Sequence, residues 1–240
     1  MSDAFLAALL AFASTGAPAG DAAALLARAE RVRAAFPEGV LTIRVTSSAP
    51  GQAARSGTFE VAVKGRERSR LRFLGTEDEG KYVVSVGNES WLLLPTSKNP
   101  IRVPASHRIR GGLAVADVAR TSFADDYDAV VEREDDLDGR HCAVLRLVAK
   151  KGASVSYPVI RLWVDEKEGL FRKAVFLVAS GRTAKEATFD GYETRKSTLV
   201  LSKMTVIDSL RTGTTVVEYL DYDRRQVPDA FFDPKTARGD

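Results

Sequence analysis

Residues 41–46 read Leu-Thr-Ile-Arg-Val-Thr, an alternation of apolar and polar side chains. The same period of two returns at residues 59–64 and 82–86. Successive side chains of a β-strand point to opposite faces of the sheet, so each stretch predicts a strand that buries one face. These stretches indicate that strands dominate the fold.

Strand-like runs continue toward the C-terminus, at 68–74, 90–95, 142–149, 157–165, 171–179, 183–192, 198–208 and 213–222. Turn-forming pairs such as Pro50-Gly51 and Gly87-Asn88 separate neighbouring runs. Many short strands at a spacing of ~8–15 residues predict an antiparallel meander. The chain shows no alternation of strands with helices, which argues against a Rossmann-like fold.

Helices are expected at two places. Residues 21–36 carry apolar side chains at steps of three and four, with Asp21 as a cap and Pro37 and Gly39 as stop signals. A second, short apolar helix is expected from Leu113 to Arg120. The predicted class is therefore mainly β (α+β), with about ten to eleven strands.

Composition limits the classes of protein. The chain has 240 residues, 45% of them hydrophobic and 28% charged, which fits one ordinary domain or at most two small ones. A net charge of +3 is too small to indicate nucleic-acid binding. One cysteine excludes an internal disulfide and a cysteine-built metal site, and two histidines exclude a histidine-rich one.

The N-terminus resembles an export signal. Residues 4–13 form an uncharged apolar run, too short to span a bilayer, and Ala17-Pro18-Ala19 fits a small-x-small cleavage site. Residues 1–19 are thus expected to be a signal peptide, and 20–240 a single exported domain. The expected basic residues before the run are missing, which a translation start further upstream would explain. The alternative is an apolar N-terminal helix of the folded domain. Cys142 lies far from the cleavage site, so no lipid anchor is expected.

No constellation of catalytic residues stands out. His141 and Cys142 are neighbours on a predicted strand and point to opposite faces, so they cannot form a nucleophile–base pair. Asp125-Asp126 lacks the spacing of a calcium loop, and neither a G-x-S-x-G motif nor a phosphate-binding glycine loop occurs. We expect no enzyme, no metal and no cofactor.

Charge is distributed unevenly in the middle of the chain. Residues 90–116 contain no acid but carry Lys98, Arg102, Arg108 and Arg110, whereas residues 117–138 are strongly acidic. Two solvated surfaces that pair locally would explain this pattern. A docking surface for an acidic partner or anionic headgroups is the other interpretation.

Large apolar side chains on the predicted strands exceed what two helices can cover. A half-open barrel with helices across its mouth would accommodate them, and its interior would suit an acyl chain. A filled core without a cavity remains the alternative.

The stretch Trp91-Leu92-Leu93-Leu94-Pro95 is followed by Lys98, Ile101-Arg102-Val103, Ser106, Arg108, Gly111-Gly112 and Asp117. Together with the tail Val227-Pro228-Asp229-Ala230-Phe231-Phe232, this order resembles the outer-membrane lipoprotein-sorting proteins of the LolA-like superfamily. The resemblance spans about residues 21–234. In this chain Val118 follows Asp117 where the family has an aromatic residue. The family's lid-holding arginine has no certain equivalent among Arg66, Arg68, Arg70 and Arg72.

The resemblance implies a curved antiparallel sheet that forms an incomplete barrel with a short helical lid. It implies a periplasmic, transiently membrane-contacting carrier of lipoprotein or lipid acyl chains, served by an inner-membrane transporter and an outer-membrane acceptor. With it, the expected cavity residues are Phe59, Val61, Leu71, Phe73, Trp91, Leu93, Leu145, Leu162 and Leu177. The expected lid residues are Leu113, Val115 and Phe123, and the expected docking residues are Lys98, Arg102, Arg108 and Arg110. We expect a monomer. A periplasmic sensor on the same scaffold, or a structural β-module, is the alternative.

Overall fold

A computed structural model describes residues 19–75, 78–104, 107–110, 113–114, 122–153, 155–210 and 212–238. The predicted signal peptide lies outside these residues except for Ala19. The larger sheet contains β1 Glu38–Ser48, β2 Arg55–Lys64, β3 Arg68–Leu74, β4 Tyr82–Val86, β5 Glu89–Leu93, β6 Ile101–Val103, β9 Tyr127–Leu137, β10 Arg140–Ala149, β11 Val159–Asp165, β12 Leu170–Leu177, β13 Thr183–Arg195, β14 Thr198–Asp208 and β15 Gly213–Asp223. A separate hairpin pairs β7 Arg108–Arg110 with β8 Leu113–Ala114.

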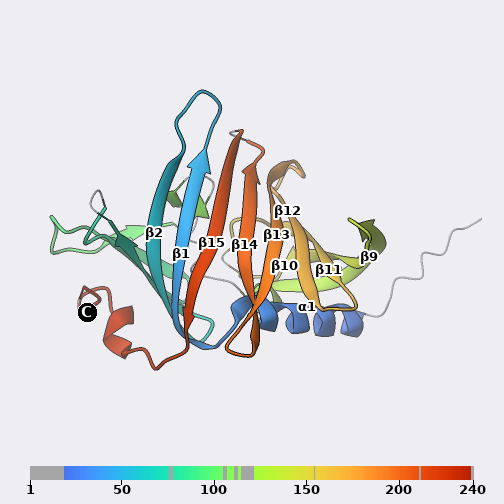
Figure 1. Cartoon of the computed structure of the whole chain (residues 1–240), viewed down its shortest axis with the longest axis horizontal. Coiled ribbons are helices and arrows are strands. Elements are labelled where there is room, and N and C mark those ends of the chain that lie inside the picture. Colours follow the sequence, from blue (N-terminus) through green and yellow to red (C-terminus); the bar gives the residue numbers. More distant parts are fainter. Residues whose placement is uncertain are drawn as a thin grey trace, which may run out of the picture.

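The sheet is one antiparallel array of thirteen strands, in the order β6-β5-β4-β3-β2-β1-β15-β14-β13-β12-β11-β10-β9. Strands β6 and β9 form its two edges, so the barrel is not closed (Figure 1). In the centre, Val45 of β1 pairs with Gly57 of β2 on one side and with Val217 of β15 on the other. The predicted fold class is confirmed, with more strands than the ten to eleven expected.

The additional long strand is β9, which falls in the acidic stretch. Its Tyr127, Ala129 and Val131 face the core, while charged side chains such as Glu132 face outward. Charged residues on an edge strand hinder pairing with another chain, which explains this composition. The helix expected at 113–120 is wrong at its start, because Leu113–Ala114 is a strand. Residues 115–120 lie outside the described residues.

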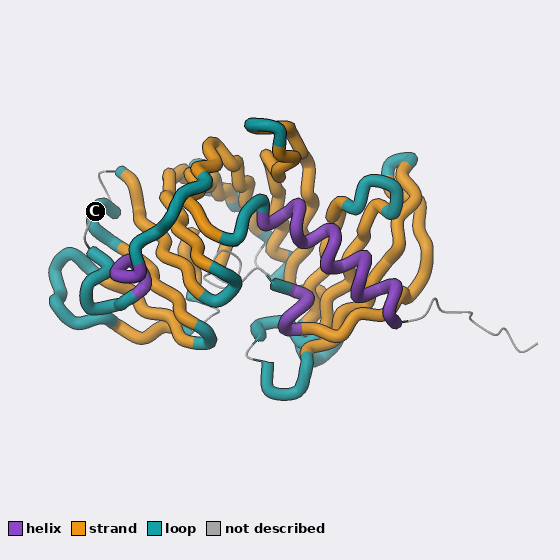
Figure 2. The backbone as a smooth tube through the Cα atoms, turned by 90° about the horizontal axis from the view of Figure 1, so that it is seen from below, coloured by secondary structure: helices purple, strands orange, loops and turns teal. Residues whose placement is uncertain are grey.

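Helix α1, Ala19–Ala34, covers one half of the sheet (Figure 2). Its Ala22, Leu26 and Ala29 are each at most 1% exposed and pack against an apolar cluster built from β9 to β14. The short helix α3, Phe123–Asp126, packs beside α1 and contributes Phe123 to the same cluster. The predicted N-terminal helix is confirmed to within two residues at each end.

The other half of the sheet presents a second apolar face on its concave side. It comprises Ile43, Val45, Phe59, Val61, Leu71, Phe73, Val83 and Val217. Among the described residues, the side chain that packs on this face from outside the large sheet is Ile109 of β7. Helix α1 therefore leaves this half largely without helical cover.

The convex side of the same half is covered by the C-terminal segment, which we define as residues 224–238. Val227 and Phe232 pack on Val40 and Ala62, and Ala237 packs in a cluster with Leu93. The 3₁₀ turn η1, Asp229–Phe232, belongs to this segment. Hydrogen bonding to Lys64, together with the nearby Arg68, holds the pKa of the Asp229 carboxyl below its usual range.

Arg70 of β3 holds the C-terminal segment against the sheet. It is 1% exposed, donates a hydrogen bond to the carbonyl of Ala237 at 3.0 Å, and lies 3.4 Å from a carboxylate oxygen of Glu60. Its guanidinium carbon is 3.5 Å from the ring centroid of Phe231. Burial of a charge is costly unless it is paired and hydrogen-bonded, so these contacts must form together.

We expect Arg70→Met to lower the free energy of unfolding by roughly 2–4 kcal/mol, because a buried charge-assisted contact set is lost. In a double-mutant cycle with Phe231→Ala, the two changes should couple by about 1 kcal/mol, as a buried cation–π contact would. Denaturant unfolding measures both quantities. The same cycle with the exposed Leu199→Ala is the control and should be additive; equal coupling in both cycles would contradict the assignment.

Candidate functional site: an apolar cavity between the sheet and the helix

A cavity of about 430 Å³ lies between the C-terminal end of α1 and the concave face of β1, β2, β14 and β15. This volume is within the range of ~300–1,000 Å³ that small-molecule sites occupy. The apolar part of its lining consists mainly of strand residues that share one face, together with Phe36: Leu41, Ile43, Val61, Val63, Met204, Val217 and Tyr219. The cavity thus borders the second apolar face, whose buried residues are each at most 8% exposed.

Polar and charged side chains form a rim along one side of the cavity. Glu30 of α1 is 6% exposed and accepts hydrogen bonds from the amides of Phe123 at 2.5 Å and Ala124 at 3.2 Å. It also accepts one from the Ser122 hydroxyl at 3.3 Å. Arg33 forms an ion pair with Glu30 at 3.5 Å and lies over the Phe123 ring, 5.2 Å from its centroid. The carboxylate of Glu30 therefore accepts hydrogen bonds from the first amides of α3, although Glu30 lies 93 residues before Phe123 in the sequence.

Arg66 joins the rim from the sheet side. It lies in the turn between β2 and β3, lines the cavity, and forms an ion pair with Asp125 at 2.6 Å. Arg66 therefore contacts the segment 122–126 beside the cavity, whereas Arg70 contacts the C-terminal segment. Both partners of the Arg66–Asp125 pair are about half exposed, so the pair itself is weak.

The structure separates the nine residues expected to line one cavity. Val61 lines the cavity described above, and Phe59, Leu71 and Phe73 lie in the same apolar cluster. Leu145 and Leu162 are fully buried beneath α1 in the other half, and Leu177 belongs to neither cluster. Trp91 and Leu93 share a face, as the alternation predicted, but that face is convex and packs on Ala237.

Several cavity residues were not predicted from the sequence. Leu41 and Ile43 were recognised as strand residues but not as cavity residues, and Met204, Val217 and Tyr219 lie more than 150 residues further along the chain. They meet because β1 pairs with β15, near the end of the chain. Alternation identified these strands, but it carries no information on which strands become neighbours.

The expected lid and docking residues also lie apart. Phe123 packs against Tyr127, Phe171 and Phe176 beside α1. Leu113 is in β8, and Val115 lies outside the described residues. Arg102 pairs with Glu89, Arg110 pairs with Asp78, Lys98 is exposed, and Arg108 is in β7. The pairing partners of Arg102 and Arg110 thus lie outside the acidic stretch.

Other chemistry is sparse in the part of the chain that the structure describes. No group of three or more His, Cys, Asp and Glu side chains there could hold a metal ion. Cys142 is buried, and burial raises the pKa of its thiol, which makes it a poor nucleophile. No helix among those residues is long and apolar enough to cross a bilayer.

The fold matches several solved structures closely. A LolA superfamily protein from Nitrosomonas europaea is 27% identical over 88% of this chain and 97% of that one, with a TM-score of 0.81. A DUF1329 family protein from Desulfovibrio piger is 20% identical over 90% and 97%, with a TM-score of 0.80. A domain from Vibrio parahaemolyticus named for outer membrane lipoprotein sorting is 15% identical over 92% and 100%, with a TM-score of 0.79.

The match to the Nitrosomonas europaea protein defines the class as the LolA superfamily, and the other two matches show the same open-sheet fold. A family model described as "Uncharacterized protein" matches residues 65–237, and the chain belongs to this family. No curated protein matches the chain in a sequence comparison. The resemblance noted in the sequence is therefore confirmed at the level of the superfamily.

We expect Glu30→Ala to lower the free energy of unfolding by about 1–3 kcal/mol, because the amides of Phe123 and Ala124 at the start of α3 lose their acceptor. The amides of Phe123 and Ala124 should exchange hydrogen faster with solvent. Denaturant unfolding and amide hydrogen exchange measure the two effects. Glu67→Ala changes an exposed glutamate in the turn after β2 and should stay within about 0.5 kcal/mol; equal effects of both variants would refute the capping role of Glu30.

Proposed function

We propose that the protein is a periplasmic carrier that binds the acyl chains of a lipoprotein or another lipid in the cavity beside α1. The observation that carries this proposal is the 430 Å³ cavity between α1 and the apolar concave face of the sheet. The proposal assigns binding and release to the protein, and no catalytic step. The superfamily of its relatives supports the same assignment.

The energetics suit a reversible carrier. Each methylene group that moves from water into the cavity contributes ~0.8 kcal/mol, so an acyl chain supplies a large driving force. The rim side chains Glu30, Arg33 and Arg66 already have partners within the protein. An acyl chain that enters the cavity therefore displaces only packed apolar side chains and breaks no ion pair of the rim. A membrane offers the acyl chain a similarly apolar environment, so the protein can release it there.

Val63→Asp should weaken binding of a neutral long-chain ligand roughly 10- to 100-fold, because it places an unpaired carboxylate in the apolar lining. Val63 is half-buried, so the variant is expected to fold. The matched control is Val130→Asp, since Val130 is 43% exposed on β9, remote from the cavity. Native mass spectrometry of gently purified protein, before and after addition of phospholipid or diacylated lipopeptide, measures occupancy.

A wild-type protein that arrives without lipid and takes up neither ligand would contradict the carrier proposal. Lipid binding without transfer to acceptor membranes would instead favour a periplasmic sensor on the same scaffold. Equal loss of binding in the Val63 and Val130 variants would place the ligand elsewhere on the protein.

The cellular part of the proposal rests on the N-terminal sequence. We propose that residues 1–19 are removed on export and that residues 20–240 act as one soluble domain between an inner-membrane transporter and an outer-membrane acceptor. The exposure of Lys98 and Arg102 supports a role for these residues in such contacts. N-terminal sequencing of protein from its native host should give Gly20 as the first residue, whereas recovery of an intact Met1 form from the cytoplasm would contradict export.

A further inference from the structure

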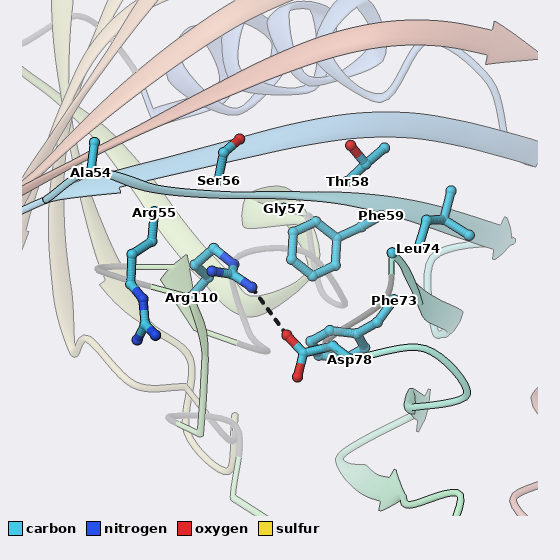
Figure 3. A pocket seen from close by; sticks show the side chains of 11 residues that line it. Ala54, Arg55, Ser56, Gly57, Thr58, Phe59, Phe73, Leu74, Asp78 and Arg110 are labelled. Atoms are coloured by element: carbon cyan, nitrogen blue, oxygen red, sulfur yellow. Dashed lines mark hydrogen bonds and ion pairs between the residues drawn. The ribbon is translucent and has the colours of Figure 1, made fainter.

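A second hollow of about 410 Å³ opens on the same concave face, at the opposite end of β2 (Figure 3). Its floor is formed by Phe59 and Phe73, and its polar side chains include Arg55, Asp78 and Arg110. Arg55, Gly57 and Phe59 are alternate residues of β2, so they share the concave face. The hollow therefore combines an aromatic floor with two guanidinium groups.

Arg110 is held over this hollow by specific contacts. Its guanidinium bonds a carboxylate oxygen of Asp78 at 3.1 Å and lies 6.0 Å from the ring centroid of Phe59. Its side chain is 16% exposed, and its Nε is buried without a hydrogen bond to the described part of the chain. A Cβ at Gly57 would lie 2.9 Å from this Nε, so glycine leaves the space in which the guanidinium lies.

The electrostatic balance of the hollow favours an anion. Asp78 also bonds the ammonium of Lys81 at 2.5 Å, so Arg110 is not required to neutralise it. Arg55 is exposed and forms no ion pair with the described residues, and Figure 3 shows its side chain on the same side of β2 as that of Arg110. A carboxylate or phosphate placed here would receive charge-assisted hydrogen bonds.

The two hollows adjoin along β2. Phe59 lines the hollow at Arg110 and Val61 lines the apolar cavity, and these are successive inward positions of one strand. At ~3.3 Å per residue, Gly57 lies about 13 Å from Val61 and about 20 Å from Val63. One acyl chain extends over about half of the ~30 Å hydrocarbon core of a bilayer, or roughly 15 Å. A single amphiphile can therefore reach both hollows.

We propose that the hollow at Arg110 binds the anionic head of the amphiphile whose acyl chain occupies the apolar cavity. This inference rests on the proposed carrier function and adds a substrate class. The substrate is an amphiphile that has one acyl chain and a carboxylate or phosphate at the end of that chain. Arg110 supplies the main contact, Arg55 adds charge at the rim, and Gly57 leaves room for the guanidinium of Arg110. Ile109, next to Arg110, packs against the apolar cluster of the concave face.

The test compares laurate with dodecanol, which share a chain and differ in the charge of the head. At about pH 8 the carboxylic acid is ionised. By equilibrium dialysis, the wild type should bind laurate about tenfold more tightly than dodecanol, as charge-assisted contacts would give. Arg110→Gln should reduce this ratio to near one while leaving the affinity for dodecanol unchanged. Gly57→Leu fills the hollow without changing charge and should also abolish the preference.

Arg146→Gln is the matched control, because Arg146 is an exposed arginine on β10, in the other half of the sheet, and lines neither hollow. It should keep the wild-type ratio, and a loss of preference in this variant would overturn the assignment to Arg110. Equal binding of both ligands by the wild type would overturn the head-group site and leave the carrier function standing. Failure to bind either ligand would contradict the carrier function itself. Butyrate or inorganic phosphate binding as tightly as laurate would show a site for a small free anion and overturn joint occupation.

Discussion

A helix of 16 residues is about 24 Å long, whereas thirteen strands at ~4.8 Å spacing form a sheet roughly 58 Å wide. Helix α1 can therefore bury only part of the concave face, and it lies over the half formed by β9 to β14. In the other half, β15 and β1 to β5 still carry apolar side chains inward. Because one helix is narrower than the sheet, a second apolar face lies beyond α1, and both hollows lie along it.

The convex and concave sides of this half of the sheet differ in what packs on them. The C-terminal segment closes the convex side, where Arg70 and the Lys64–Asp229 pair fix it in place. On the concave side, Ile109 packs on the apolar face and Arg110 lies over Phe59, and two hollows are left beside them. These hollows are the parts of the concave side that a ligand can enter, and concave, partly apolar hollows are typical of ligand sites. The asymmetry therefore supports binding on the concave side.

The sequence predicted the elements well and their neighbours poorly. Alternation in residues 41–46 and 59–64 identified β1 and β2, because one face of each strand is buried. Trp91 and Leu93 were expected at a cavity since their size suggested it, but a period of two does not say which face is concave. That choice depends on Ala237, more than 140 residues away. Strand β9 was missed because its outward positions are acidic, as an edge strand requires.

The end of α1 decides whether a cavity exists at all. Ala35 has a left-handed backbone with φ of 59°, which ends the helix, and Pro37 follows it. The carbonyl of Pro37 accepts a hydrogen bond from Gly65 at 2.7 Å, which ties this turn to the end of β2. Gly39 is required next, because a Cβ there would lie 2.5 Å from the carbonyl oxygen of Asp223. A helix one or two turns longer would lie over Leu41 and Val63 and fill the space, so the turn at residues 35–39 preserves the cavity by stopping the helix before it.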